Sequence, residues 1–144
     1  MLYEELKLPK IPYELVFHNP NTVREKQPNI WREVPTTVYT QHTVDKELIE
    51  FLKPHFDFEL KIRYQVLEHN VPIHKDIGRV AAINYILDAG GDNVVTRWYE
   101  DDKQTVKFEK QIPIQVWHRI DTTVYHGIHG IQDKRLALTI SLHE

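Results

Sequence analysis

The chain has 144 residues, a formal net charge of −3 and a sequence pI near 6.3, and 41% of its residues are hydrophobic. This composition suits one globular domain with an ordinary core, and nucleic acid is not indicated because no strongly basic balance is present. The absence of cysteine excludes disulfides, thiolate catalysis and cysteine-ligated zinc. The N-terminus is acidic, and no run approaches the roughly 18 apolar residues of a membrane span, so we expect a cytoplasmic protein without a membrane partner.

Residues 1–57 are expected to form an extended and partly helical support for the rest of a single domain, 1–144. Proline removes a backbone donor, and this region holds prolines at positions 9, 12, 20, 28 and 35. The region is therefore predicted to be irregular, with one edge strand at 13–17 (YELVF). The β-branched stretch 34–40 (VPTTVYT) predicts a second strand.

One helix is predicted, at 43–54 (TVDKELIEFLKP). Thr43 is a suitable cap, Asp45 falls in the first turn, and apolar residues recur every four positions until Pro54 ends the pattern. This helix is expected to pack on the outside of the sheets.

After residue 57 the sequence changes to short alternating or apolar runs with turn residues between them. The predicted strands lie at 58–67, 79–87, 94–100, 105–111, 112–118, 122–126 and 135–143. Roughly eight short strands at this spacing indicate a mainly β fold, which could be a sandwich, a barrel or a jelly roll.

The motif HKDIGR at 74–79 places His74 and Asp76 two residues apart, just before an apolar strand. Residues i and i+2 of a strand point to the same side, so an imidazole and a carboxylate at a strand edge could hold one metal ion together. His126 follows 52 residues later, at the end of the predicted strand 122–126. These three residues make a two-histidine, one-carboxylate set, which with open positions suits non-haem Fe(II).

Arg135 opens the last predicted strand, nine residues after His126, and Thr139 shares its face of that strand. An arginine that points inward among leucine, isoleucine and alanine is costly to bury unless it is paired. Because its fork matches a carboxylate and the sequence offers no evident protein partner, an incoming carboxylate ligand is the candidate partner.

These motifs resemble those of the Fe(II)/2-oxoglutarate-dependent dioxygenases, and most closely the prolyl-hydroxylase-like branch. The family pattern of HxD, a distal His and an Arg nine or ten residues further on is present here as HKD, YHGI and DKRLALTISL. The resemblance covers about 58–142 and implies a double-stranded β-helix, or jelly roll, as the catalytic core. It implies Fe(2+) on His74, Asp76 and His126, which would be the catalytic residues.

The resemblance also implies that 2-oxoglutarate and dioxygen are the small-molecule reactants. A hydroxylated product, succinate and CO2 would be formed, and the prime substrate stays unidentified. Halogenating members replace the aspartate with a small residue, so the presence of Asp76 favours hydroxylation.

Within that branch, Tyr64, Arg135 and Thr139 occupy positions that bind the 5-carboxylate of 2-oxoglutarate. A further tyrosine of the branch aligns with Ile86, next to Tyr85 and two residues from Asn84, and which of these faces the site is left open. We take Asn84 as the further cosubstrate-binding candidate.

Several alternatives accompany this interpretation. His129, six residues before Arg135, competes with His126 for the metal, although spacing favours His126. Arg79 is interpreted as an exposed or salt-bridged residue at a strand start, or as a ligand contact. The aromatic residues Trp98, Tyr99 and Trp117 are interpreted first as core residues, one of which could face the site. His118 is interpreted as a core or surface residue, with a place at the mouth of the site as the alternative. The competing function is a non-catalytic, cupin-like metal-binding or sensor protein.

Overall fold

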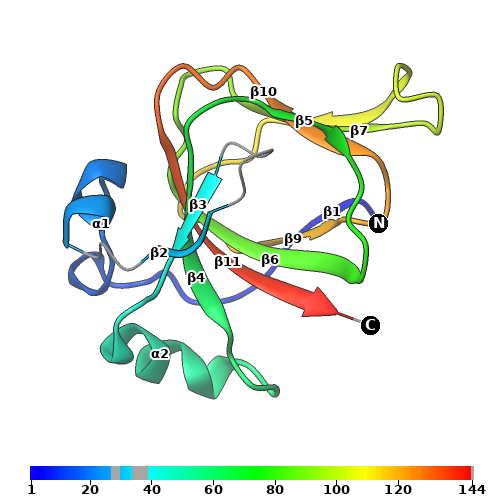
Figure 1. The fold of residues 1–144 in the computed structure, drawn as a ribbon. Helices are drawn as coiled ribbons and strands as arrows, with labels where there is room; N and C mark the ends of the chain where they lie inside the picture. Colours follow the sequence, from blue (N-terminus) through cyan, green and yellow to red (C-terminus); the bar gives the residue numbers. More distant parts are fainter. Residues whose placement is uncertain (27–29, 34–38, 144) are drawn as a thin grey trace.

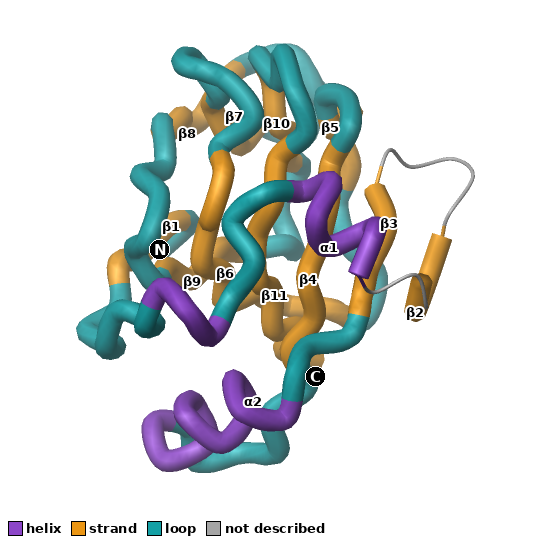
Figure 2. Tube along the Cα trace, turned by 90° about the vertical axis from the view of Figure 1, so that its left-hand side faces the viewer, coloured by secondary structure: helices purple, strands orange, loops and turns teal. Residues whose placement is uncertain are grey.

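The computed structural model describes residues 1–26, 30–33 and 39–143 and consists mainly of antiparallel strands in two sheets (Figure 1). One sheet has seven strands and the other has four. Figure 2 shows the smaller sheet lying above the larger one. This mainly β, two-sheet architecture with few helices confirms the predicted jelly roll.

The strands of the larger sheet lie in the order β1 (Tyr3–Glu5), β9 (His118–Asp121), β6 (Arg79–Asp88), β11 (Arg135–His143), β4 (Ile62–Leu67), β3 (Tyr39–His42) and β2 (Ile30–Glu33). Those of the smaller sheet lie in the order β5 (Val71–His74), β10 (His126–His129), β7 (Val95–Tyr99) and β8 (Val106–Lys110). The α-helices are α1 (Pro20–Lys26) and α2 (Lys46–Leu52), and short 3-10 helices occur at Tyr13–Leu15 and Lys53–His55.

The predicted helix at 43–54 is present as α2, which continues as a 3-10 turn through Pro54. Its N-cap is Asp45, with extended backbone (φ −73°, ψ 152°), so the expected Thr43 cap is wrong. The helix lies on the far side of the larger sheet from the smaller sheet, as expected (Figure 1).

The edge strand predicted at 13–17 is wrong, because Tyr13–Leu15 is a 3-10 helix, and α1 was not predicted from the sequence. Proline disfavours a helix interior, yet Pro20 is tolerated in the first turn, where its missing donor would be unpaired anyway. Asn19 precedes the helix and its side chain accepts a hydrogen bond from the Asn21 amide at 2.8 Å.

Most predicted strands of the second half are present, namely at 58–67, 79–87, 94–100, 105–111 and 135–143. The strand predicted at 112–118 is wrong except for its last residue, because Pro113 lacks a donor and Gln115 adopts a positive φ of 57°. The strand predicted at 122–126 is also displaced, since His126 begins β10 instead of ending a strand.

The remaining strand differences lie at β5 and β3. Strand β5 was not predicted from the sequence. Residues 34–38 of the strand predicted at 34–40 lie outside the described residues, and Tyr39 and Thr40 belong to β3. After residue 57 the described residues hold eight strands, β4 to β11, in agreement with the roughly eight expected there.

The larger sheet has an apolar outer face, which packs against α2 and the N-terminal segment. Leu48 and Leu52 of α2 are buried in this cluster. The strand residues of the outer face are Ile62, Tyr64, Val66, Ile83, Tyr85, Leu87, Leu136, Leu138 and Ile140. This is the main hydrophobic core, so the described N-terminal residues that are buried in it, among them Val23, contribute directly to stability.

The inner face of the same sheet points toward the smaller sheet and is more polar. Tyr3 of β1 contacts the smaller sheet from this face, because the centroid of its ring lies 5.5 Å from the Lys110 ammonium of β8. The buried apolar cluster on this side is small and consists of Ile86, Ile112 and Ala137. The polar residues of this face include Arg135, Thr139, Asn84 and His118.

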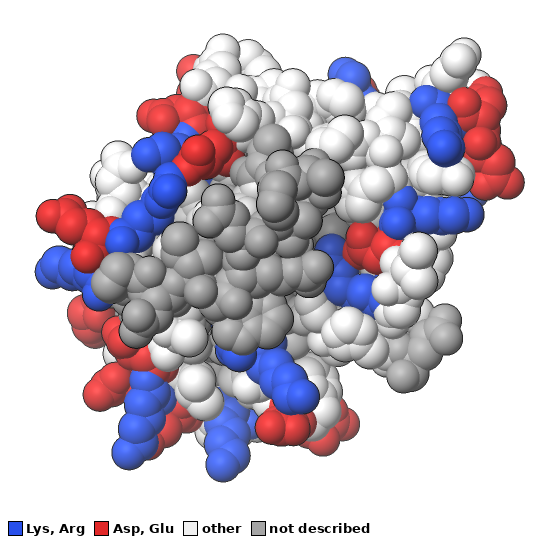
Figure 3. All heavy atoms as spheres, in the orientation of Figure 1, with Lys and Arg blue, Asp and Glu red and all other residues white. Residues whose placement is uncertain are grey.

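Charged residues of both signs are interspersed over the face seen in Figure 3, without one sign dominating it. No helix of the described residues is long and apolar enough to span a bilayer.

Candidate metal centre and anion-binding residues

His74, Asp76 and His126 converge on one point between the sheets. Each offers one ligand atom, and these atoms all lie within 4.8 Å of one another. The two histidines are direct partners in the antiparallel pairing of β5 with β10, and their ring centroids are 4.5 Å apart. Strand pairing therefore brings together two residues that are 52 positions apart in the sequence.

Asp76 reaches this point by a different route from the one expected. Strand β5 ends at His74, so Asp76 does not share a strand face with it. Asp76 lies in the turn before β6, where its amide donates to the Thr122 carbonyl at 3.0 Å and Gly78 adopts a φ of +87°. The hydrogen bond to Thr122 holds this turn, and the turn directs the carboxylate toward the two histidines.

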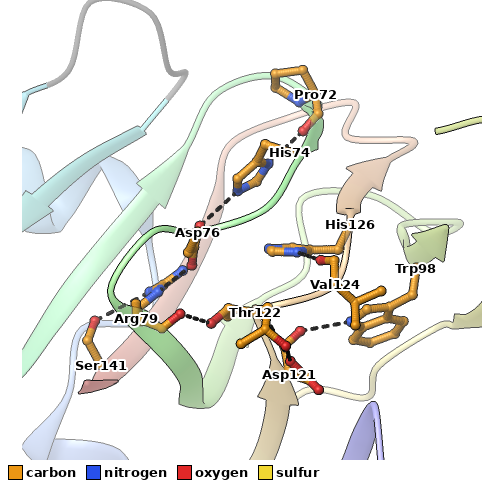
Figure 4. A network of polar contacts seen from close by, with 11 residues as sticks. Pro72, His74, Asp76, Arg79, Trp98, Asp121, Thr122, Val124, His126 and Ser141 are labelled. Atoms are coloured by element: carbon orange, nitrogen blue, oxygen red, sulfur yellow. Dashed lines mark hydrogen bonds and ion pairs between the residues drawn. The ribbon is translucent and has the colours of Figure 1, made fainter. Parts of the chain in front are cut away.

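Both histidines have the same ring nitrogen occupied. Nδ1 of His74 donates to the Pro72 carbonyl at 2.8 Å, and Nδ1 of His126 donates to the Val124 carbonyl at 2.7 Å (Figure 4). Because a carbonyl can only accept, Nδ1 carries the proton in each ring, and a neutral ring then has its lone pair on Nε2. This is the arrangement in which an outer hydrogen bond fixes a ligating imidazole.

The Asp76 carboxylate divides its oxygens between two partners. Oδ1 lies 3.3 Å from Nε2 of His74, and Oδ2 lies 2.6 Å from Nε of Arg79. Burial alone would raise the pKa of Asp76, but the hydrogen bond with His74 and the charge and hydrogen bond of Arg79 outweigh it and lower the pKa to about 2. The carboxylate is therefore ionised at neutral pH.

The pKa values of the two histidines shift in opposite directions. The hydrogen bond with Asp76 is the main cause that raises the pKa of His74. Burial is the main cause that lowers the pKa of His126, which is only 5% exposed. Two imidazole nitrogens and one ionised carboxylate oxygen form a donor set that fits Fe(II) with positions left open.

Three of the predicted anion-binding residues, namely Arg135, Thr139 and Asn84, lie on the inner face of the larger sheet. Arg135 is 6% exposed and Thr139 is 3% exposed, and Asn84 is the cross-strand partner of Thr139. Burial lowers the pKa of Arg135 to about 10. Within the described ranges, no hydrogen bond or ion pair to the Arg135 guanidinium is present.

A close approach of backbone holds the start of β11. Gly90 has a φ of +80°, and a Cβ placed on it would lie 3.0 Å from the Arg135 Cβ and 2.8 Å from the Asp133 carbonyl oxygen. The Gly90 carbonyl accepts hydrogen bonds from the amides of Gln132 and Asp133. A larger residue than glycine would therefore displace the strand that carries Arg135.

Tyr64 is the predicted site residue that the structure does not bring to this place. It pairs with Leu138, whereas Thr139 pairs with Arg63, so Tyr64 lies on the outer face. Its hydroxyl accepts a hydrogen bond from the Phe17 amide at 3.1 Å, and burial raises its pKa to about 12. The expected contact of Tyr64 with a carboxylate ligand is therefore corrected to a role in the outer core.

The choice left open among three neighbours on β6 is also decided by this alternation. Asn84 and Ile86 pair with Thr139 and Ala137 and lie on the inner face. Tyr85 pairs with Leu138 and lies in the outer core, where its hydroxyl accepts a hydrogen bond from the Ile11 amide at 3.3 Å.

His118 is a buried residue of the inner face, which agrees with the core placement that was one of its interpretations. It pairs with Asn84, is 1% exposed and donates from Nδ1 to the Val116 carbonyl at 3.1 Å. Burial, with the nearby charge of Arg135, lowers its pKa to about 4. The sequence signal that could have placed it is the alternation of HRID, in which His118 and the apolar Ile120 share one face of the strand.

Two unpartnered polar atoms lie on the same inner side. The Tyr3 hydroxyl and the Asn84 Oδ1 are buried without a hydrogen-bond partner among the described residues. No sequence signal pointed to Tyr3, because β1 has only three residues and pairs with the distant β9. Buried polar atoms of this kind call for a ligand or an ordered water.

The remaining candidates are placed as follows. His129 lies outside the cluster, with Nε2 2.8 Å from the Tyr99 hydroxyl. Trp98 pairs with His126 across β7 and β10, and its indole donates to the Asp121 carbonyl at 3.0 Å (Figure 4). Trp117 packs in the outer core.

Comparisons with known proteins support the fold. No protein-family model and no curated protein matches the sequence. AviO1 from Streptomyces viridochromogenes Tue57 is similar in structure over 99% of this chain and 90% of its own, with a TM-score of 0.57 and 13% identity. At that identity the likeness shows a shared fold alone.

Two further solved structures resemble the chain more distantly. Procruciferin, an 11S globulin from Brassica napus, has a TM-score of 0.49 and 12% identity over 81% of this chain, which spans only 27% of the globulin chain. An oxidoreductase of the 2OG-Fe(II) oxygenase family from Burkholderia pseudomallei has a TM-score of 0.49 and 9% identity over 84% of this chain and 75% of its own. Likenesses at this level carry no argument about activity.

Proposed function

We propose that the chain is a non-haem Fe(II)/2-oxoglutarate-dependent dioxygenase that hydroxylates an unidentified substrate and releases succinate and CO2. The observation that carries the proposal is the pairing of two features. A two-histidine, one-carboxylate cluster lies between the sheets, and a buried arginine without an ion-pair partner among the described residues lies on the inner face. A protein that only binds a metal has no need of the second feature.

In this proposal His74, Asp76 and His126 hold Fe(2+), each through one atom. Because Nδ1 is anchored in both rings, Nε2 would be the atom that binds the metal, and the carboxylate would offset part of its charge. When bound, the iron supplies the oxidative chemistry with dioxygen. The protein's part is to fix three ligands and leave three positions open.

Arg135 and Thr139 bind the distal carboxylate of 2-oxoglutarate. A guanidinium can hold a carboxylate through two parallel hydrogen bonds, and a low-dielectric surrounding strengthens that pairing. Asn84, next to Thr139 on the adjoining strand, adds a polar contact on the same side. Tyr64 is left out, so the resemblance to the prolyl-hydroxylase-like branch keeps Arg135 and Thr139 but loses one member of its pattern.

The proposal includes the setting in which the enzyme acts. We treat residues 1–144 as one domain, because the N-terminal residues share the outer core with the strands. Fe(II) and 2-oxoglutarate are both available in the cytoplasm, which is where we place the protein.

Formation of succinate from 2-oxoglutarate in the presence of Fe(II) tests this function directly. Because the prime substrate is unidentified, the assay is repeated with a screen of peptides, amino acids, nucleobases and small metabolites. Arg135→Leu should abolish succinate formation, whereas Arg97→Leu should retain it, because Arg97 is paired with Glu109 on the exposed side of the smaller sheet. Metal binding without succinate formation, in every condition, would favour the non-catalytic metal-binding jelly roll.

A further inference from the structure

Arg79 is the residue that contacts the metal-centre carboxylate without being a candidate ligand. Its Nε donates to Oδ2 of Asp76 at 2.6 Å, while Oδ1 of the same carboxylate faces His74 (Figure 4). One oxygen is thus held by the arginine, and the other is left toward the point where the ligand atoms converge.

Arg79 is itself held in place from two sides. Its Nη1 donates to the Ser141 hydroxyl on β11 at 3.3 Å, and its carbonyl accepts from the Thr122 hydroxyl at 2.7 Å. Thr122 is fully buried, and its own carbonyl accepts the Asp76 amide at 3.0 Å. Backbone and side chain of Asp76 are therefore fixed by one closed network that joins β6, β11 and the segment before β10.

The number of carboxylate oxygens on the metal decides how many positions are open. A carboxylate can bind a hard cation through one oxygen or through both. With one oxygen and two imidazoles bound, an octahedral ion keeps three positions, and with both oxygens bound it keeps two. A chelating 2-oxo acid and dioxygen together need three positions, so the distinction bears on the reaction.

We infer that Arg79 is a positioning residue that restricts Asp76 to one-oxygen ligation and so keeps the third position open. The inference rests on the metal centre of the proposed function and adds a role to a residue outside the ligand set. The charge of Arg79 is paired with Asp76, whereas Arg135 has no ion-pair partner among the described residues and is available to an incoming carboxylate.

The test uses Mn2+ alone, with the full chain and without 2-oxoglutarate. Water-proton relaxation counts the exchangeable waters on bound Mn2+, and this number reports the open positions. Arg79→Met removes the charge and keeps the length of the side chain. It should lower the count from three waters to two, a fall of about one third.

Arg79→Lys keeps a cation beside Oδ2 and should retain three waters. Arg97→Met is the matched control, since Arg97 pairs with Gly127 rather than with His126 and its guanidinium is bound to Glu109 on the exposed side of the smaller sheet, and it should also retain three waters. If Arg79→Met does not fold, Arg79→Leu replaces it, with the same expected loss, because neither side chain can donate to Oδ2. The apo melting temperature of each variant shows which of them are folded.

Three waters on a folded Arg79→Met or Arg79→Leu variant would overturn the role assigned to Arg79. Failure of the wild-type protein to bind Mn2+ would be a different result. It would overturn the metal centre itself, and the proposed function with it.

Discussion

The two faces of the seven-stranded sheet are made from alternate residues of the same strands, yet they differ in chemistry. On β11, Leu136, Leu138 and Ile140 point outward into the main core, whereas Arg135 and Thr139 point inward. The outer face buries apolar area and stabilises the fold. The inner face buries polar groups, some of them unpartnered, which costs stability unless a ligand binds them.

This contrast explains why a jelly roll can be stable while its interior is polar. The N-terminal segment and α2 provide a second layer over the outer face, so the space between the sheets does not have to act as the main core. Residues between the sheets are then available for binding.

The largest expected effect is on metal affinity, and it compares two histidines of β10 in the four-stranded sheet. His126→Ala should abolish tight binding of Fe(II) or Mn2+. The loss should exceed the roughly 10- to 100-fold that removal of an outer hydrogen-bond partner costs. His129→Ala should leave metal affinity within about twofold, because His129 pairs with Tyr99 instead. Calorimetric titration of both variants with metal measures the affinities. The reverse ranking would show that His129, and not His126, is the metal ligand.

Neighbouring residues on β11 provide the next test of the comparison. Leu138→Ala should lower the free energy of unfolding of the metal-free protein by about 2–5 kcal/mol, as expected for a fully buried leucine. Thr139→Ala should have a smaller effect on stability and should weaken 2-oxoglutarate binding instead. Urea denaturation and a ligand titration separate the two outcomes. Equal destabilisation by both variants would remove the distinction between the faces.

The buried His118 predicts a pH dependence of stability. Its pKa is about 4 in the folded protein, below the value near 6.5 of an unfolded histidine. The unfolded chain therefore binds a proton first, and the free energy of unfolding should fall as pH drops from about 6.5 toward 4, by up to roughly 3 kcal/mol. His118→Gln should flatten this part of the profile relative to wild type.

The exposed His55 provides the control for that measurement, and His55→Gln should leave the slope unchanged. Denaturant titrations at several pH values compare the three proteins. A His118→Gln profile as steep as that of wild type would show that His118 titrates normally.

The smallest expected effect concerns Tyr64. Tyr64→Phe should lower the free energy of unfolding by about 1 kcal/mol, through loss of the hydrogen bond from the Phe17 amide. Binding of 2-oxoglutarate should not change. A clear loss of 2-oxoglutarate affinity, measured by the same ligand titration, would show that Tyr64 does contribute to cosubstrate binding.

The alternation and spacing of short strands allowed the fold class to be predicted, and the spacing of the motifs allowed the gathering of His74, Asp76 and His126 to be predicted. The route of Asp76 was not predicted, because it lies in a turn and does not share a strand face with His74. Tyr64 could not be placed in this way, since a shift of one residue in strand register moves a side chain to the opposite face. The pairing of β1 with β9 was hidden because long-range partners of a three-residue strand leave no local pattern. Arg79 could be recognised as a residue at a strand start, but its contact with Asp76 depends on the turn that precedes β6.

The central claim is that the inner face binds a carboxylate ligand beside a metal ion, and melting temperature tests it most directly. A ligand that binds only the folded state stabilises it by about 2.7 kcal/mol at a hundred times its dissociation constant, which corresponds to several degrees for a domain of this size. Wild-type protein with metal should therefore melt higher when 2-oxoglutarate or N-oxalylglycine is added, and succinate should have a smaller effect. Arg135→Leu should keep the gain from metal and lose the gain from 2-oxoglutarate. No gain from millimolar 2-oxoglutarate in metal-loaded wild-type protein would contradict the claim.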